Sequence, residues 1–227
     1  MSIKRSVVAV AATVFAAGVI MLATLSAGAA TPECVENCIS IFSRVLGSYA
    51  NPNVVETVLD GVAEVGQPVI QAPASGSDSS QDFLPDVRTV SDFYEAGLVS
   101  AEVNDHYGTE TAAQIRYAPF GDTSNGLCVG LATTAFQGQG LTLQPCSVSA
   151  RTVWIVDTPM GAPEFYVTIV NGSTTDFSRP FAMTYPQDQL ATDQRTQQIL
   201  VRRLQFLGKD KVVPDRQLWG LHFGPLP

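Results

Sequence analysis

The sequence has few of the side chains on which metal and acid–base chemistry depends. It contains two histidines and four cysteines among 227 residues, and 15% of its residues are charged. The histidines, His106 and His222, lie far apart and belong to no His-Glu-x-x-His motif, so the common zinc signatures are absent. The Gly-x-Ser-x-Gly motif of serine hydrolases does not occur either. We therefore expect no metal, no cofactor and no catalytic residue.

Basic residues are also scarce. Thirteen Lys and Arg stand against twenty-one Asp and Glu, for a net charge of −8. A protein that coats DNA or RNA neutralises phosphates with clustered Lys and Arg, so we expect no nucleic-acid partner. The hydrophobic content of 45% excludes disorder throughout and suits one domain of ordinary size, with or without a small appendage.

Long apolar runs are confined to the N-terminus. Lys4 and Arg5 precede an uncharged run over 6–25, which is followed by the small residues Ser-Ala-Gly-Ala-Ala at 26–30. This order is typical of a secretory signal peptide that is cleaved after one of the last two alanines. The alternative is an uncleaved anchor, because about twenty apolar residues suffice to span a bilayer. We expect a secreted protein that contacts a membrane only through an uncleaved signal.

The residue pattern and composition change twice along the chain after the signal. Apolar residues recur at three- and four-residue steps over 31–65, which predicts a short helical hairpin. Residues 66–88 are rich in Pro, Ser, Gly and Asp without a period, as is typical of a linker. We therefore place the main domain at 89–227, with the helical segment docked on it, self-associated or partly ordered.

The main domain contains short apolar or alternating runs separated by turn-forming clusters. Eight such runs within 89–227 predict an all-β barrel or sandwich, and one helical stretch at 90–103 leads into it. The runs are 115–117, 127–131, 141–143, 153–156, 165–170, 181–185, 198–201 and 218–223.

The even number of cysteines in an exported chain most simply means two disulfides. Cys128 and Cys146 fall on the two strands of a predicted hairpin, where a bridge would hold the pair together. Cys34 and Cys38 are four positions apart, and a regular helix keeps such Cβ atoms about 5–6 Å apart, whereas a disulfide needs about 3.5–4.5 Å. A local bridge therefore requires a distorted first turn, which Pro32 permits. We predict this bridge, with intermolecular or crossed pairing as the alternatives.

The stretch from 126 to 156 resembles one unit of a ricin B-type β-trefoil lectin. Such a unit runs from Cys-Leu through a glycine turn to a second Cys and a Gln-x-Trp strand. Trp154 takes the tryptophan place with Thr152 in place of Gln, and Gln217-Leu218-Trp219 matches Gln-x-Trp in full. The same segments are similar to a group of exported actinobacterial proteins, with Leu-Gln-Pro-Cys before a Trp strand and Val-Asn-Gly-Ser. The resemblance implies a mainly β, β-trefoil-like barrel with Trp154 and Trp219 in its core.

The spacing of the units requires an adjustment. If three equal units filled 89–227, each would be shorter than the interval between Trp154 and Trp219. An insertion is therefore expected, and the polar stretch 186–196 is the place for it.

The resemblance also defines where a sugar would bind. Ricin B-type units hold vicinal hydroxyls between an Asp just after the first Cys and an Asn or Gln near the last strand, over an aromatic platform. Val129 and Gly130 follow the first Cys here, so this unit is expected to keep the scaffold without the sugar site. The candidate ligand-binding residues are Asp176, Tyr185 and Gln217 in the later unit. Gln217 has a simpler interpretation, an amide that satisfies backbone groups beside a core tryptophan.

Two further motifs have a weaker meaning. Asp105 and His106 are a candidate metal or proton-transfer site, although a lone loop histidine is typically solvated. Asn171-Gly172-Ser173 fits a glycosylation sequon, and an Asn-Gly turn between strands explains it equally well.

The sequence as a whole favours an exported, non-enzymatic binding or accessory module, with carbohydrate as the candidate ligand in a degenerate site. One alternative is a secreted polysaccharide hydrolase that uses a pair of carboxylates. The other is a structural or protein-interaction role in which 31–65 forms the contact. No oligomeric state is indicated.

Overall fold

The structure is a computed structural model that describes residues 37–48, 50–147, 149–159, 162–186 and 198–224. They belong to one compact unit, Thr31–Pro227. The predicted signal peptide, Cys34 and nearly all of the stretch 186–196 lie outside the described residues. No helix in the described part of the chain is long and apolar enough to cross a membrane.

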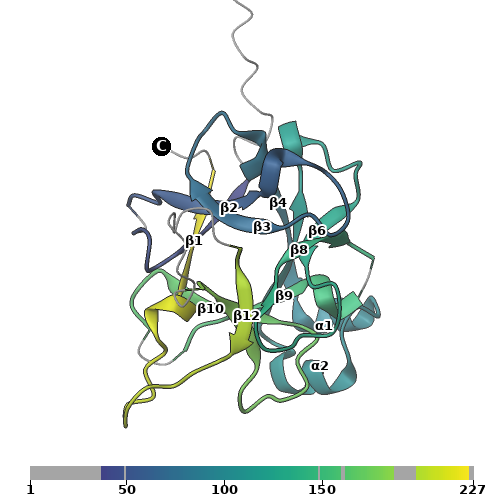
Figure 1. The fold of residues 1–227 in the computed structure, drawn as a ribbon. Helices are drawn as coiled ribbons and strands as arrows, with labels where there is room; N and C mark the ends of the chain where they lie inside the picture. The colour runs from purple at the N-terminus through teal and green to yellow at the C-terminus, as the bar shows by residue number, and fades with distance from the viewer. Residues whose placement is uncertain (1–36, 49, 148, 160–161, 187–197, 225–227) are drawn as a thin grey trace, which may run out of the picture. The chain divides into compact units, whose positions relative to one another are not determined.

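The fold is mainly β, as predicted (Figure 1). Each of the eight predicted runs overlaps a strand, and the predicted helical stretch forms α1 (Val90–Glu95) and α2 (Ala101–Tyr107). The strands are β1 (Ile39–Ser43), β2 (Val54–Val58), β3 (Val69–Pro73), β4 (Phe83–Thr89), β5 (Thr111–Tyr117), β6 (Leu127–Gly130), β7 (Gln139–Gly140), β8 (Thr142–Pro145), β9 (Val153–Asp157), β10 (Tyr166–Asn171), β11 (Phe181–Thr184), β12 (Leu200–Arg203) and β13 (Trp219–Phe223).

Twelve of these strands form three units of four. The first unit is β1 to β4, the second is β5, β6, β8 and β9, and the third is β10 to β13. Within each unit the second and third strands pair, and the last strand of each unit pairs with the first strand of the next. The pairing of Ile39–Ser43 with Trp219–Phe223 joins the third unit to the first and closes the ring.

Three buried residues mark the pseudo-threefold axis. The backbone N–H of Val69 donates to the carbonyl of Leu141 at 2.9 Å, that of Leu141 to Ile199 at 2.8 Å, and that of Ile199 back to Val69 at 3.0 Å. One residue comes from each unit, and all three are buried. This cycle shows that the three hairpins meet in equivalent positions.

The predicted helical hairpin at 31–65 and the predicted linker at 66–88 are wrong. The described residues of these segments form β1 to β4, which is the first unit of the trefoil. Every residue of β1 and β2 is buried. A strand that is buried on both faces does not alternate between apolar and polar residues, so the spacing of its apolar residues can match that of a helix. The apolar residues of β1 and β2 therefore belong to the barrel, while Leu59, Val62 and Val65 are exposed.

The linker-like composition of 66–88 comes from turns and from one proline inside a strand. Pro85 lies in the middle of β4, but β4 pairs only with β5 among the described strands, so the missing N–H breaks no ladder on its other side. The boundary predicted at 89 therefore separates the first and second units of one domain.

The last strands of the three units carry equivalent aromatic residues. Phe83, Trp154 and Trp219 each lie opposite the final residue of the next unit's first strand, and all three are buried. The indole N–H of Trp154 donates to the Val129 carbonyl at 2.8 Å, and that of Trp219 to the Met183 carbonyl at 2.9 Å.

The same equivalence corrects the repeat length. The interval from Phe83 to Trp154 is close to the interval from Trp154 to Trp219. The long spacing is thus the repeat itself, and no insertion is needed to explain it.

A second core cluster lies outside the barrel. Val90, Phe93 and Val103 of the two helices pack with Ile155 and Val170 of β9 and β10. Helix α1 begins with a capping box, in which Thr89 and Asp92 exchange side-chain and backbone hydrogen bonds.

Candidate functional site

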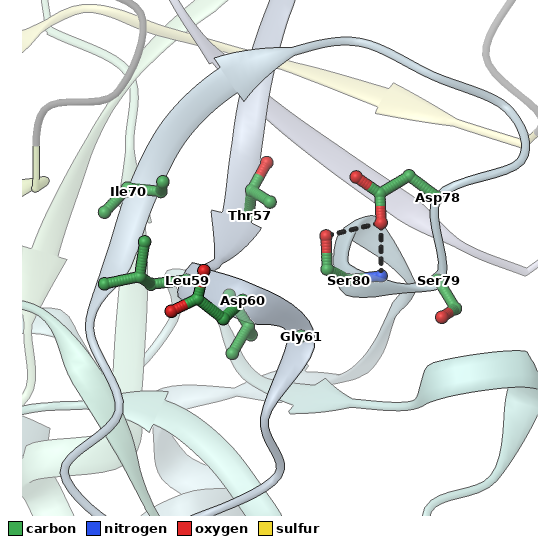
Figure 2. Close-up of a pocket in the computed structure, with 9 residues that line it drawn as sticks. Thr57, Leu59, Asp60, Gly61, Ile70, Asp78, Ser79 and Ser80 are labelled. Atoms are coloured by element: carbon green, nitrogen blue, oxygen red, sulfur yellow. Dashed lines mark hydrogen bonds between the residues drawn. The ribbon is translucent and has the colours of Figure 1, made fainter.

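A pocket of about 490 Å³ opens beside the β2–β3 hairpin of the first unit (Figure 2). No sequence motif marks it, because its residues come from two turns and two strands whose sequence does not match the trefoil pattern. The residues that line it are Thr57, Val58, Leu59, Asp60, Gly61, Ile70, Asp78, Ser79 and Ser80.

The turn that follows β2 sets one wall of the pocket. Asp60 and Gly61 have φ values of 57° and 66°, both in the left-handed region, and this pair bends the chain sharply. The phenol of Tyr117, from β5 of the second unit, donates to the Gly61 carbonyl at 3.0 Å and holds the turn in place.

The turn before β4 sets the opposite wall. The Asp78 carboxylate accepts hydrogen bonds from the Ser80 backbone N–H at 3.0 Å and from the Ser80 hydroxyl at 2.6 Å. Figure 2 shows Asp60 and Asp78 on opposite sides of the pocket, with Thr57 between them. The pocket therefore offers carboxylate and hydroxyl oxygens from both walls.

The lining is suited to a neutral polar ligand. Two carboxylates and three hydroxyls stand beside the aliphatic side chains of Leu59 and Ile70, and none of the nine lining residues is basic. An anion would lack a counter-charge here, whereas a ligand rich in hydroxyls would find both acceptors and donors.

The register of the hairpins identifies the equivalent positions in the other units. We count from Val69, Leu141 and Ile199, the three residues at the pseudo-threefold axis. The residues two positions after them occupy equivalent places in the three units, and so do the residues opposite these on the neighbouring strand. The three resulting pairs are Glu56–Gln71, Val129–Leu143 and Met183–Val201. The next residues along the chain are therefore also equivalent: they are Thr57, Gly130 and Thr184.

Thr57 and Thr184 support this equivalence, because each hydroxyl donates to the carbonyl two residues earlier, at 3.1 Å and 3.0 Å. Gly130 is one of the two residues that follow the first Cys of the second unit, where the ricin B-type pattern has its Asp. All three positions are neutral, so none supplies that acid. In the first unit alone of the three, this position lies on the pocket of Figure 2.

The positions equivalent to Thr57 in the second and third units, Gly130 and Thr184, are closely packed by other side chains. A Cβ at Gly130 would lie 2.8 Å from Cγ2 of Thr152, so the second unit has no room there. Thr184 is fully buried, and its hydroxyl accepts a hydrogen bond from the Gln217 amide at 3.0 Å.

Gln217, a candidate ligand-binding residue, forms hydrogen bonds with backbone groups of the barrel. Its carbonyl oxygen accepts from the Gln205 backbone N–H at 2.8 Å, and its amide donates to the Arg203 carbonyl at 3.2 Å. Gln81 of the first unit does the same, with the Ser75 N–H at 2.9 Å and the Pro73 carbonyl at 2.8 Å. The simpler interpretation of Gln217 therefore describes its contacts.

Asp176 and Tyr185, the other two candidates, lie in different surroundings. Asp176 accepts from Ser178 and forms an ion pair with Arg203 at 3.0 Å, and the Ser178 hydrogen bond is the main reason that its pKa is lowered. Tyr185 is 1% exposed, and burial raises the pKa of its phenol. Neither residue lines the pocket of the first unit.

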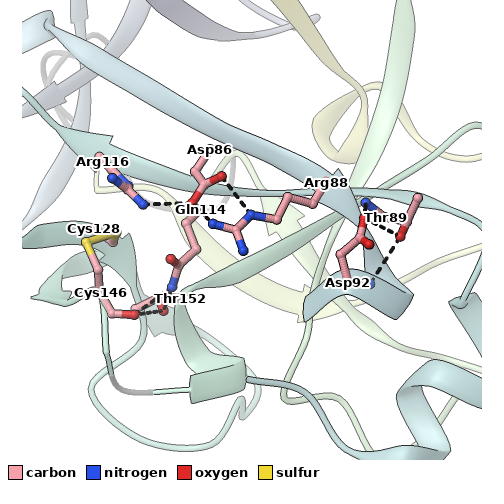
Figure 3. Close-up of polar contacts among 9 residues, drawn as sticks. All are labelled: Asp86, Arg88, Thr89, Asp92, Gln114, Arg116, Cys128, Cys146 and Thr152. Carbon is pink, nitrogen blue, oxygen red and sulfur yellow. Dashed lines mark hydrogen bonds and ion pairs between the residues drawn. A yellow bond between two sulfur atoms is a disulfide. The ribbon is translucent and has the colours of Figure 1, made fainter. Parts of the chain in front are cut away.

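In the second unit two residues make the contacts that a single glutamine makes in the first and third units. Thr152 stands where Gln81 and Gln217 stand, and Gln114 from β5 donates to its hydroxyl at 2.9 Å and to the Cys146 carbonyl at 2.6 Å (Figure 3). Cys146 is bridged to Cys128, with Cα atoms 4.9 Å apart. The pairing of Cys38 with Cys34 stays a prediction, because Cys34 is not among the described residues.

A surface network lies near this disulfide in Figure 3. Asp86 accepts from Arg88 and from Arg116, each at 2.7 Å. The hydrogen bond from Arg88 is the largest cause of the lowered pKa of Asp86. All three side chains are partly exposed to solvent, so the network contributes little to stability.

The remaining motifs have ordinary surroundings. His106 stacks on Phe177, with ring centroids 4.8 Å apart, and the described residues hold no group of three His, Cys, Asp or Glu side chains placed for a metal. Asn171 is buried, and its amide donates to the Arg151 carbonyl at 3.1 Å. The Asn-Gly-Ser sequence is therefore a turn within the barrel.

Comparison with known proteins identifies the fold. The chain is similar to ThreeFoil, a designed 3-fold symmetric protein, with a TM-score of 0.52, 12% identity, and coverage of 82% of this chain and 98% of that one. It is also similar to an exo-β-1,3-galactanase from Clostridium thermocellum (TM-score 0.51, 13% identity, 82% and 30% coverage) and to a mosquitocidal holotoxin (TM-score 0.51, 13% identity, 83% and 17% coverage). No protein-family model and no curated protein matches the chain.

These similarities confirm the predicted β-trefoil fold. Residues 89–227 make up less than two thirds of the chain, whereas the matches cover 82% and 83% of it. The trefoil therefore includes residues before 89, in agreement with the first unit described above.

Proposed function

We propose that this protein is an exported, non-enzymatic binding module whose ligand is a carbohydrate held in the pocket of the first unit. The observation that carries the proposal is the lining: carboxylates and hydroxyls on two facing walls, beside aliphatic side chains. Sugars present hydroxyls that both donate and accept hydrogen bonds, together with apolar C–H faces. A concave site with a few convergent polar groups is the usual form of a small-ligand site.

The proposed site differs from the ricin B-type arrangement. The acid is not on the second strand, where Thr57 stands, but on the turn that follows it, at Asp60. Asp78 is already engaged by Ser80, so Asp60 is the carboxylate that we expect to accept from the ligand. Leu59 and Ile70 replace an aromatic platform, which predicts modest affinity because aliphatic side chains give less stacking area.

The proposal is tested with a glycan array and a polysaccharide pull-down on residues 31–227, followed by titration of the best ligand. Asp60→Asn keeps the size of the side chain and removes its charge, and Thr57→Val removes a hydroxyl. We expect each variant to weaken binding about tenfold. Asp105→Asn, an acid outside the pocket, is the matched control and should bind as the unchanged protein does. Absence of binding to every glycan, or equal binding by all variants, would contradict the proposal.

A polysaccharide hydrolase is the second candidate. It needs two carboxylates that flank one bond, and Asp60 and Asp78 stand on opposite walls of the same pocket (Figure 2). Incubation of the bound polysaccharide with the unchanged protein and with Asp60→Asn separates the two functions. Release of reducing ends that stops in the variant would favour the hydrolase, and binding without release favours the module.

Export is supported by the charged start and apolar run of residues 1–30 and by the Cys128–Cys146 disulfide, which suits an oxidising compartment. Mass spectrometry of protein recovered from the culture medium should show a chain that begins at Ala30 or Thr31. A full-length chain that stays with the cells would contradict export.

A further inference from the structure

An apolar hairpin projects from the third unit. It spans residues 206–212, between β12 and β13, and every one of its residues is exposed. Leu207 and Val212 exchange backbone hydrogen bonds of 2.8 Å and 3.1 Å across it. Figure 1 shows this segment in yellow at the lower left, extending away from β12. Its shape is therefore defined, although its side chains are not packed into the core.

The exposed side chains of the hairpin are apolar at its base and mainly basic at its tip. Phe206, Leu207 and Val212 are 46%, 55% and 49% exposed, and Lys209 and Lys211 lie between them in the sequence, on either side of one aspartate. The apolar residues that flank the hairpin are buried: Leu204 is 3% exposed and Val213 is 4% exposed. Along this segment, exposure of apolar side chains is therefore confined to the hairpin itself.

The charge around the hairpin is opposite to that of the rest of the protein. Residues 202–216 contain five basic and two acidic side chains, a net charge of +3, whereas the other residues contain eight basic and nineteen acidic ones, a net charge of −11; together these give the −8 of the chain. A basic segment in an acidic protein indicates an anionic partner.

We propose that the 206–212 hairpin inserts into the surface of an anionic lipid bilayer, a membrane contact that the sequence did not predict. This contact is separate from the carbohydrate pocket and does not depend on it. A specific protein interface buries about 800 Å² on each partner, which is more than so short a hairpin offers. A bilayer surface needs only a few apolar side chains at the headgroup level, together with basic residues near anionic lipids.

The two kinds of side chain have different roles in this contact. Phe206, Leu207 and Val212 enter the boundary between headgroups and acyl chains, while Lys209 and Lys211 lie among the anionic headgroups. Binding is therefore expected to require anionic lipid, to weaken with salt, and to fall about fivefold for each lysine removed.

Vesicle flotation tests the proposal on residues 31–227, which form one compact unit and leave out the apolar N-terminal run. Vesicles of phosphatidylcholine alone are compared with vesicles that also contain phosphatidylglycerol. We expect binding to the second kind only. Phe206→Ser combined with Leu207→Ser should reduce it at least tenfold, and Lys209→Gln combined with Lys211→Gln should reduce it about 25-fold at low salt.

Phe136→Ser is the matched control, because Phe136 is 54% exposed and lies outside the hairpin. It should leave binding unchanged, and thermal unfolding should show all variants folded. Phe206→Trp adds a direct reading: Trp154 and Trp219 are buried at 1% and 0% exposure, so the new emission should shift to the blue on binding while theirs stays constant.

Three results would overturn the proposal. They are absence of binding to phosphatidylglycerol vesicles, an equal loss in Phe136→Ser, and an unshifted emission of Phe206→Trp in the presence of vesicles. Light scattering gives the remaining outcome: a dimer that the Phe206→Ser and Leu207→Ser variant abolishes would assign the hairpin to a second copy of the chain instead.

Discussion

The first unit differs from the second and third at a pair of equivalent positions. In the later units these are Val129 with Leu143 and Met183 with Val201, all buried and apolar. In the first unit they are Glu56 and Gln71, which are 2% and 0% exposed. One trefoil unit thus carries a polar pair on the barrel side of its hairpin, where its counterparts carry hydrocarbon.

The polar pair replaces a strand contact. In the later units the first strand pairs with the second through one bridge, Arg116–Cys128 or Val170–Ala182. Among the described strands, β1 pairs only with β13 and β2 only with β3. The Ile41 backbone N–H donates instead to the Glu56 carboxylate. A side chain therefore satisfies a backbone group that a strand partner would otherwise satisfy.

This replacement leaves polar atoms without partners. The second carboxylate oxygen of Glu56 and both amide atoms of Gln71 make no hydrogen bond to any described residue. The pocket of Figure 2 lies in the first unit, and the Cys128–Cys146 disulfide lies in the second. The comparison teaches that equivalent positions of the three units can be occupied by a polar or an apolar pair, and that the polar pair leaves buried atoms without hydrogen bonds.

The largest expected effect concerns the aromatic core of the second unit. Trp154→Ala should lower the free energy of unfolding by about 3–5 kcal/mol, because it removes a buried indole and leaves a cavity. Urea unfolding measures the change, with Trp219 as the remaining fluorophore. A native emission of Trp154 already at solvent wavelengths would contradict its burial.

The disulfide of the second unit has the next largest effect. Replacing Cys128 and Cys146 by alanine should cost about 3 kcal/mol, because a bridge across a sequence separation of 18 restricts the unfolded chain. The measurement is the urea midpoint of the double variant against that of the unchanged protein. An unaltered midpoint would contradict a stabilising role of the bridge.

The polar pair of the first unit predicts a gain in stability. Gln71→Leu keeps most of the side-chain volume and removes two buried atoms that lack partners, so it should stabilise the protein by about 1–3 kcal/mol. Val201→Gln, the reverse change at the equivalent position of the third unit, is the matched control and should destabilise it. If Gln71→Leu destabilises instead, the amide is satisfied in solution, for example by buried water.

The smallest effect is the pH dependence contributed by Glu56. Burial raises its pKa well above 4.5, partly opposed by the hydrogen bond from Ile41. The folded state therefore holds the proton more tightly than the unfolded state does. The stability that this group contributes is complete below about pH 4.5 and is lost as the pH rises through the folded pKa, by no more than about 1.4 kcal/mol per pH unit.

Glu56→Gln isolates this contribution, because it keeps an oxygen acceptor for the Ile41 N–H and cannot ionise. Urea unfolding of both proteins over a pH series should show the unchanged protein losing stability relative to the variant as the pH rises. Parallel curves would mean that the pKa of Glu56 is the same in the folded and unfolded states.

The sequence predicted the second and third units better than the first. Cys128, Cys146 and Trp154 lie in a pattern that resembles a known repeat, and the later strands alternate or are bounded by clear turns. In the first unit Phe83 stands in place of tryptophan, and Gln81-Asp82-Phe83 does not match Gln-x-Trp. Because β1 and β2 are buried on both faces, their sequences lack the sustained alternation of apolar and polar residues that identifies a strand.

The pocket was beyond sequence reasoning for a related reason. Thr57, Asp60 and Asp78 belong to segments whose sequence predicts a helix and a linker, and their convergence depends on how β2, β3 and the flanking turns pack. The resemblance to a lectin unit pointed to Asp176, Tyr185 and Gln217 by their residue types and their place in the later unit. The structure shows that two of them are buried and that Asp176 is paired with Arg203.

The sequence by itself determined the mainly β fold class, the disulfide hairpin and the tryptophan strands, because hydrophobic pattern, turn residues and cysteine positions act over short distances along the chain. Only the tertiary structure decided that residues 39–89 complete the trefoil. That assignment rests on the closure of β1 against β13 and on the cycle of hydrogen bonds through Val69, Leu141 and Ile199. Both are contacts between residues far apart in the sequence, and no local pattern encodes them.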